Sequence, residues 1–257
     1  MSAYEALAFS YDGLTQDIAY EETLNFVESV LQRLGKSPKT VLDLACGTGS
    51  LSVLLARQGY AVLGVDLSED MLTVAYDKAL ELEGERPLFI CQPMQELELP
   101  QPVELAVCCL DSLNYVTDPA DVRETFRRVY DHLTPGGVFL FDINSAHKLR
   151  GLDGQVFLDE NDDSYCVWRA EFEEAENICY YGIYLFQRDG DVWRRSFEEH
   201  AEYAYTTEEL TQWLLEAGFD LVLHMGDRRL TPPRPEEQRI YFAAVKEEPW
   251  AIRLSEP

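Results

Sequence analysis

The sequence predicts an α/β protein built on a doubly wound, mostly parallel sheet, and three observations support this fold class. Short apolar runs alternate with helical patterns over residues 20–144, as successive strand–helix units require. A glycine-containing turn separates the first run from the helix after it, and polar residues end the later runs. The chain has 257 residues, of which 46% are hydrophobic, so it can bury a large core.

The predicted elements follow one another in the order that such a sheet needs. Helices are expected where apolar residues recur at three- and four-residue spacing, and strands where short apolar runs stand between turn residues. The predicted helices are residues 20–34, 50–57, a helix that starts at 69, 118–133 and 206–218. The predicted strands are 41–44, 61–65, 88–91, 105–110, 138–144, 219–225 and 239–246, with a tight break at Pro135-Gly136-Gly137 before the fifth.

The turn after strand 41–44 predicts a nucleotide site. Gly47 and Gly49 let the backbone approach a ligand closely, and Asp66 ends the next strand at the same edge, where a carboxylate can accept both hydroxyls of a ribose. A triphosphate loop needs Lys-Ser or Lys-Thr after the glycines, but Ser50-Leu51 follows here. A dinucleotide fingerprint needs a third glycine where Ser52 stands, so NAD is the weaker alternative.

Residues 145–205 interrupt the alternation of strands and helices. They contain strand-like runs at 165–172, 178–187 and 192–205, rich in acidic and aromatic residues, which indicates an antiparallel insertion. Residues 178–186 are apolar on both alternations, so we expect the core, a substrate or a second subunit to cover both faces, and this is compatible with a homodimer. The expected division is a domain of residues 1–144 and 206–257 with a lid of residues 145–205.

Charge and composition limit the partners. The net charge of −26, from 21 basic and 47 acidic residues, would repel a phosphate backbone, although a local basic groove stays open as an alternative. There is no run of eighteen apolar residues, and the first residues lack the pattern of a signal peptide. We therefore expect a cytoplasmic protein without nucleic-acid or membrane partners. No cysteine spacing indicates zinc, so no metal is expected.

The pattern Asp43-Leu-Ala-Cys-Gly-Thr-Gly49 resembles motif I of the class I S-adenosylmethionine-dependent methyltransferases. Pro135-Gly136-Gly137 and Asp111–Tyr115 are similar to two later motifs of that family. The resemblance implies a Rossmann-like sheet of seven strands whose last strand is antiparallel, S-adenosyl-L-methionine as cofactor and S-adenosyl-L-homocysteine as product. A sheet inserted after the fifth strand resembles the substrate lid of small-molecule N- and O-methyltransferases, including those that act on amino sugars and glycine.

The resemblance also implies which residues bind the cofactor. They come from the N-terminal tyrosines, motif I, the acidic end of the second strand and the loops after the third and fourth strands. These residues are Tyr11, Tyr20, Asp43, Ala45, Gly47, Gly49, Asp66, Leu67, Pro93, Met94, Gln95 and Leu110. Pro93 departs from the family, where an acidic residue often accepts a hydrogen bond from adenine, and Gln92 or Gln95 would replace that contact.

The chemistry of methyl transfer predicts the acceptor side of the site. A sulfonium is already activated, so the protein must align a nucleophile with the methyl group, exclude water and, for some acceptors, remove a proton. Candidate catalytic residues are polar groups at strand ends and on the lid: Asp111, Asn114, Tyr115 and His200. Turn or hydrogen-bonding roles stay open for them.

The function predicted is therefore methyl transfer to a nitrogen or oxygen atom of a small molecule. A regulatory S-adenosylmethionine-binding protein with a protein partner is the first alternative. An NAD-dependent oxidoreductase is the weaker one.

Overall fold

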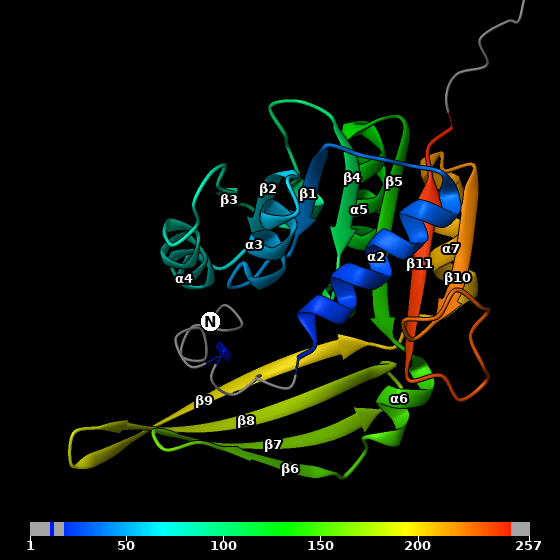
Figure 1. Cartoon of the computed structure of the whole chain (residues 1–257). Helices are drawn as coiled ribbons and strands as arrows, with labels where there is room; N and C mark the ends of the chain where they lie inside the picture. Colours follow the sequence, from blue (N-terminus) through cyan, green and yellow to red (C-terminus); the bar gives the residue numbers. More distant parts are fainter. Residues whose placement is uncertain (1–10, 13–17, 248–257) are drawn as a thin grey trace, which may run out of the picture.

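The computed structural model describes residues 11, 12 and 18–247, which form a seven-stranded sheet flanked by helices and a separate four-stranded sheet (Figure 1). The order in the large sheet is β10-β11-β5-β4-β1-β2-β3. Its strands are β1 (Thr40–Leu44), β2 (Ala61–Asp66), β3 (Leu88–Cys91), β4 (Val103–Cys108), β5 (Leu133–Asn144), β10 (Leu221–Gly226) and β11 (Arg239–Val245). β11 is antiparallel to both of its neighbours, and the remaining pairs are parallel, so the predicted fold class is confirmed.

The helices occupy the predicted positions, with one addition. They are α2 (Tyr20–Leu34), α3 (Ser50–Arg57), α4 (Glu69–Leu80), α5 (Pro119–His132), α6 (Ala146–Gly151) and α7 (Thr207–Ala217), with short 3-10 turns η1 (Met94–Glu96) and η2 (Ser112–Tyr115). Local capping explains several helix ends. Ser68 accepts a hydrogen bond from the Met71 amide, and Thr206 and Glu209 form a capping box. No helix among these residues is long and apolar enough to cross a membrane.

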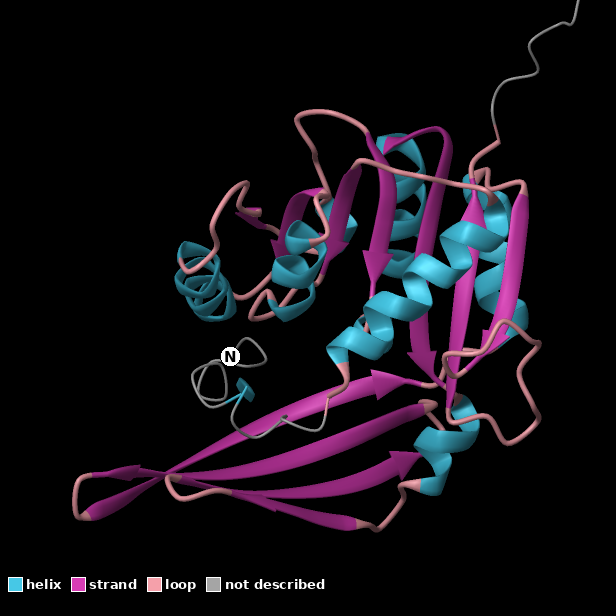
Figure 2. Ribbon diagram, in the orientation of Figure 1, coloured by secondary structure: helices cyan, strands magenta, loops and turns pink. Residues whose placement is uncertain are grey.

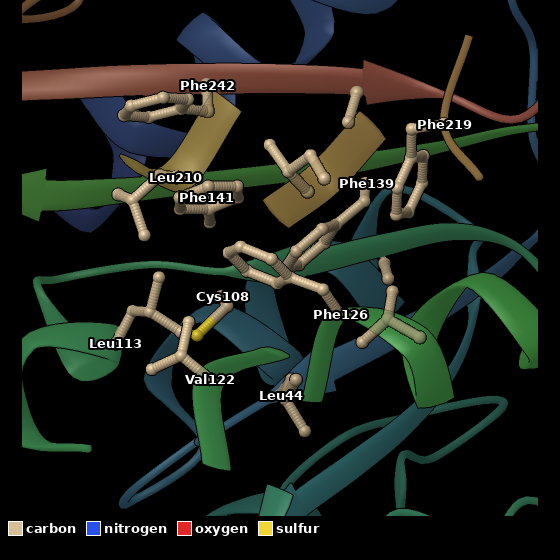
Figure 3. Close-up of a cluster of buried hydrophobic side chains, with 14 of the residues drawn as sticks. Leu44, Cys108, Leu113, Val122, Phe126, Phe139, Phe141, Leu210, Phe219 and Phe242 are labelled. Atoms are coloured by element: carbon tan, nitrogen blue, oxygen red, sulfur yellow. The ribbon is translucent and has the colours of Figure 1, made fainter. Parts of the chain in front are cut away.

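Two buried clusters hold the large sheet between its helices. α2 and α3 cover one face, and α5 and α7 cover the other (Figure 1). In the second cluster Phe126 of α5 packs against Phe139 and Phe141 of β5, and Phe141 stacks on Phe242 of β11 with ring centroids 4.7 Å apart (Figure 3). Both clusters therefore pack the antiparallel strand β11 firmly beside the parallel strands.

The second sheet lies across the edge where the parallel strands end (Figure 2). Its order is β6-β7-β8-β9, and all pairs are antiparallel: β6 (Val156–Glu160), β7 (Ser164–Glu173), β8 (Ile178–Asp189) and β9 (Val192–Tyr203). We call this sheet the lid sheet. Its inner face buries Tyr181, Ile183 and Leu185, whereas Tyr184 and Phe186 on the outer face are half-buried. We expected both faces of residues 178–186 to be covered; within this single chain the inner face is covered and the outer face is half-buried.

Two details differ from the sequence-based expectation. Pro135-Gly136-Gly137 does not break the chain before the fifth strand, because β5 already begins at Leu133. The Gly136 amide donates to the Lys246 carbonyl at 2.7 Å, and the Lys246 amide donates to the Gly137 carbonyl at 3.0 Å, so these residues are paired as in a strand. β6 and α6 were not predicted, since every residue of β6 is exposed and leaves no alternation to detect.

Candidate cofactor and acceptor site

A pocket opens at the edge of the large sheet where the parallel strands end, facing the lid sheet. Its walls come from the loop after β1, the end of β2, the loop around η1, the turn η2 and the N-terminal segment. Eight of the predicted site residues line it: Tyr11, Ala45, Asp66, Leu67, Pro93, Met94, Gln95 and Tyr115. The fold therefore brings together residues from five separate segments of the chain.

Asp66 is held by backbone donors at the end of β2. The Gly47 amide donates to Oδ2 at 2.8 Å, and the Ser68 amide donates to Oδ1 at 2.9 Å. Burial raises the pKa of the Asp66 carboxyl, and the hydrogen bonds from Ser68 and Gly47 oppose that shift. A carboxylate oxygen has two lone pairs, so each oxygen can accept a further donor such as a ribose hydroxyl.

The loop after β1 needs its glycines for packing as well as for ligand approach. Gly49 has φ of 71°, and a Cβ there would lie 2.9 Å from the Ala75 Cβ on α4. Ala45 and Leu110, which follow β1 and β4, also have positive φ, at 57° and 63°. Such backbone conformations are strained for residues with a Cβ and gather at functional sites, and here they flank the pocket.

Asp43 lies beneath this loop and does not line the pocket. It is 2% exposed, and its Oδ2 accepts a hydrogen bond of 2.5 Å from the Ser52 hydroxyl. Burial raises the pKa of Asp43 to about 7, against the lowering effect of that hydrogen bond. Ser52, which replaces the third glycine of a dinucleotide fingerprint, therefore satisfies the buried carboxyl group and fixes the loop from below.

The N-terminal tyrosines lie over the same loop. Burial raises the pKa of Tyr20 to about 12, and hydrogen bonds with Ser50 and Tyr11 act in the opposite direction. Asp12, next to Tyr11, accepts a hydrogen bond of 2.7 Å from the Thr48 hydroxyl. The described part of this segment thus contacts the loop at Thr48, between Gly47 and Gly49, and Tyr20 contacts the start of α3 at Ser50.

Asp111 is engaged in an ion-pair network at the end of β4. Arg239 of β11 contacts Asp111 at 2.5 Å and also pairs with Asp142 of β5. Asp142 is fully buried and accepts hydrogen bonds from the Leu110 amide at 2.8 Å and the Asp111 amide at 3.0 Å. Burial raises the pKa of Asp142, and Arg239 opposes that shift. The network fixes the backbone at the end of β4, and its members Arg239 and Asp142 were not predicted.

Asn114 joins the two sheets through its amide group. Its Nδ2 donates to the carbonyls of Asn144, at 3.1 Å, and Tyr203, at 2.9 Å, and its Oδ1 accepts from the Asn144 amide at 3.0 Å. The residue is fully buried. These contacts tie η2 to the ends of β5 and β9, so Asn114 positions the lid sheet relative to the pocket.

Three titratable side chains project from the inner face of β9, at alternate positions: Glu198, His200 and Glu202. The His200 ring meets the ring of Tyr115 at a centroid distance of 5.9 Å, and Tyr115 lines the pocket. His200 Nε2 lies 3.0 Å from Glu198 Oε2. The lid sheet therefore reaches the pocket wall at His200.

Glu202 is the third member of this row and is only 3% exposed. Asn144 Nδ2 donates to Glu202 Oε2 at 2.8 Å. Burial, followed by the nearby charge of Asp111, raises the pKa of Glu202 to about 8, and hydrogen bonds from Asn144 and Tyr181 lower it. Neither Glu198 nor Glu202 was predicted, and their alternation with His200 along β9 is the signal that could have found them.

This arrangement can serve two chemical purposes. The carboxylate of Asp66 between backbone donors, the glycine turn and the apolar wall of Val65, Met71 and Met94 fit a nucleoside with an amino-acid tail. The row of Glu198, His200 and Glu202, which meets Tyr115 at His200, can hold a polar acceptor and take up a proton. Among the described residues no group of three or more His, Cys, Asp or Glu side chains is placed to hold a metal ion.

Comparisons with known proteins agree with this geometry. A family model described as a methyltransferase domain matches residues 41–137. A protein of Geobacillus sp. (strain WCH70) that is named as a methyltransferase is 34% identical over 95% of this chain and 99% of its own length. YqeM of Bacillus subtilis, also named as a methyltransferase, is 33% identical over 95% of this chain and 97% of its own length.

Solved structures extend the likeness to the lid. The crystal structure of an S-adenosylmethionine-dependent methyltransferase from Clostridium acetobutylicum is 32% identical, with a TM-score of 0.84, and the match covers 96% of this chain and 100% of that one. The sugar N-methyltransferase KedS8 from Streptoalloteichus sp. is 22% identical, with a TM-score of 0.75, over 96% of this chain and 94% of its own; at this identity the likeness concerns the fold.

Proposed function

The chain belongs to the S-adenosylmethionine-dependent methyltransferases, and we propose that it methylates a nitrogen or oxygen atom of a small molecule held between η2 and the lid sheet. One observation carries the proposal. Tyr115 lines the cofactor pocket and at the same time meets His200 of the lid sheet, so the two sheets share a wall at this point. An acceptor bound there would lie beside the cofactor's methyl end.

The proposed placement of the cofactor follows the pocket lining. The ribose hydroxyls would bind Asp66, and the adenine would lie between Leu67 and the loop Pro93–Gln95. The methionine end would follow Ala45 and Gly47 beneath Tyr11 and Tyr20. Asp43, Gly49 and Leu110 would act through the backbone that they or their neighbours hold, since they do not line the pocket.

The residues on the acceptor side would position the acceptor and remove its proton. The bound sulfonium supplies an activated methyl group, and the protein contributes alignment for in-line displacement and a dry site. Tyr115 would form the wall against which the acceptor lies. With Nε2 protonated, His200 donates to Glu198, and its Nδ1 is then the basic atom that can take the acceptor's proton. Asp111 and Asn114 would position this region through their contacts with Arg239 and Asn144.

The charges around this wall favour an amine as acceptor. Of the acidic groups on this side, Asp111 is paired with Arg239 and the raised pKa of Glu202 keeps that group largely protonated near neutral pH, so Glu198, beside His200, supplies the negative charge. An amine arrives as an ammonium ion, which acidic groups attract, and must lose its proton before it attacks. The sugar N-methyltransferase KedS8 shares the fold with its lid, which is consistent with an amino-group acceptor.

The test is release of S-adenosylhomocysteine when the protein is incubated with S-adenosylmethionine and a panel of amino sugars, amino acids, aliphatic amines, hydroxy acids and phenols. We expect turnover with one or more amines. The variant His200→Gln should lose at least about tenfold in kcat, as expected for loss of a proton-accepting group. The exposed His147 gives the matched control, and His147→Gln should retain the rate. Methylation of an added polypeptide or RNA, with every small molecule left unmodified, would contradict the proposal.

A further inference from the structure

Lys78 of α4 makes contacts that neither the cofactor nor the acceptor chemistry explains. Its Nζ lies 2.7 Å from Asp12 Oδ2 and donates to the hydroxyls of Ser50, at 2.7 Å, and Thr48, at 3.2 Å. An ammonium group has three donors, and these three oxygens match them. The Lys78 side chain is 24% exposed and the Asp12 side chain 42%, so the contact is confined at its lysine end.

The partner of Lys78 is held from both sides. Asp12 Oδ2 pairs with Lys78, and Asp12 Oδ1 accepts a hydrogen bond of 2.7 Å from the Thr48 hydroxyl. Thr48 and Ser50 stand on either side of Gly49, at the start of α3. Lys78 therefore connects three segments that are distant in the sequence: α4, the cofactor loop and the described part of the N-terminal segment.

Tyr11, the neighbour of Asp12, contacts both the pocket and the lid sheet. It lines the cofactor pocket and packs against the buried cluster of the lid sheet, which includes Cys166, Tyr181 and Ile183. It also shares a hydrogen bond with Tyr20, which in turn bonds Ser50. In Figure 1 the short described piece at residues 11 and 12 lies between the large sheet and the lid sheet.

We propose that Lys78 is a positioning residue for the cofactor: its ion pair with Asp12 holds Tyr11 between the pocket and the lid sheet. Lys78 then strengthens cofactor binding without touching the cofactor. The inference rests on the cofactor placement proposed above. It assigns to a lysine on the outer helix α4 a role that the family motifs do not mark.

The test is a double-mutant cycle on S-adenosylhomocysteine affinity, measured by isothermal titration calorimetry. Lys78→Met and Asp12→Asn each remove the ion pair, and each should weaken binding about threefold to tenfold, as expected for a partly buried charge-assisted contact. The double variant should bind no more weakly than Lys78→Met alone, because both changes remove the same ion pair. Exchanging the charges, with Asp12→Lys and Lys78→Glu together, should recover most of the lost affinity.

A matched control comes from Lys39, which is exposed and precedes β1 at the opposite edge of the sheet. Lys39→Met makes the same change of charge and should leave the affinity unchanged. Asp12 lies outside the packed core, so Asp12→Asn is the variant that tests the proposal without endangering the fold. Circular dichroism and thermal unfolding of every variant would show that the affinities refer to folded protein.

Three results of the double-mutant cycle and charge exchange would overturn the inference, as would unchanged affinity in Lys78→Met. The first is that Lys78→Met weakens binding while Asp12→Asn does not. The second is that the losses of affinity in the two single variants add up in the double variant. The third is that the charge-exchanged protein binds no more tightly than the single variants. The variant Asp66→Ala distinguishes a failure of the Lys78 inference from a failure of the proposed cofactor placement. If Asp66→Ala loses affinity and Lys78→Met does not, the inference about Lys78 is wrong and the cofactor placement stands. Unchanged affinity in both would contradict the placement as well.

Discussion

Asn114 shows how a polar side chain beside a pocket can serve the fold. All three of its hydrogen bonds go to backbone groups of Asn144 and Tyr203, and the side chain is fully buried. From the sequence it was a candidate catalytic residue, because it follows a strand at the edge where ligands bind. The contacts favour a positioning role, since few lone pairs or protons are left for a substrate.

We predict that Asn114→Ala lowers the free energy of unfolding by about 2–4 kcal/mol, because it leaves buried amide and carbonyl groups of β5 and β9 without partners. Urea denaturation followed by circular dichroism would measure the change. Asn25 on α2 is exposed and provides the control, since Asn25→Ala should change stability by less than about 0.5 kcal/mol. A loss in Asn114→Ala no larger than that of the control would show that these hydrogen bonds contribute little.

Residues that act through local geometry could be predicted from the sequence, and residues that act through long-range pairing could not. The Gly47 turn and Asp66 belong to one strand–turn–helix–strand unit, so their spacing alone places them near each other. Arg239 and Asp142 are 97 residues apart and pair because β11 lies beside β5. Nothing in the local sequence around Arg239 marks it as a partner of Asp111.

At the scale of the elements, Glu202 links β9 of the lid sheet to the end of β5. It accepts hydrogen bonds from Asn144 and Tyr181. The charged groups around it are Asp111, which raises its pKa, and Lys148, which lowers it and also donates to Asn144 Oδ1 at 2.7 Å. A buried carboxyl group with a pKa of about 8 carries a proton over much of the neutral range when the protein is folded.

This shift predicts a pH dependence of stability with a definite sign. The folded-state pKa of about 8 lies above the ordinary value of 4.5, so the folded state binds more protons between these limits. The contribution of Glu202 to stability is therefore complete below pH 4.5 and falls as the pH rises toward about 8. Glutamine is a neutral isostere of the protonated glutamate, so Glu202→Gln should remove this loss of stability at high pH.

We expect Glu202→Gln and the wild type to have similar free energies of unfolding at pH 5, with the variant more stable by on the order of 2 kcal/mol at pH 8.5. Urea denaturation at the two pH values measures the difference. The exposed Glu199 on the outer face of β9 is the matched control, and Glu199→Gln should show no such pH-dependent gain. Equal pH dependence in wild type and Glu202→Gln would show that Glu202 is not the group responsible.

The elements of the large sheet were predicted more completely than those of the lid. Strands buried between helices appear as continuous apolar runs, and capping residues such as Ser68 and Thr206 mark the helix starts. β6 could not be predicted, because it is an exposed edge strand whose pairing depends on β7 rather than on its own side chains. The first residues of β5, before the predicted start at 138, also could not be predicted, because their pairing with Lys246 extends the strand.

For the molecule as a whole, the position of the pocket follows from the topology. β1, β2, β3 and β4 end at one edge, and the lid sheet, inserted after β5, lies across that edge (Figures 1 and 2). This topology brings four features together at that edge: the cofactor loop, Asp66, the turn η2 and the row of side chains along β9. A pocket at the ends of parallel strands is where a doubly wound fold binds nucleotide ligands.

The central claim is that S-adenosylmethionine occupies this pocket with its ribose on Asp66. The most direct test is calorimetric titration of S-adenosylhomocysteine into the wild type, Asp66→Ala and the control Asp77→Ala, whose side chain is exposed on α4. We predict that Asp66→Ala weakens binding about tenfold to a hundredfold through the loss of charge-assisted hydrogen bonds to the ribose, and that Asp77→Ala binds like the wild type. Wild-type affinity in Asp66→Ala would contradict the claim.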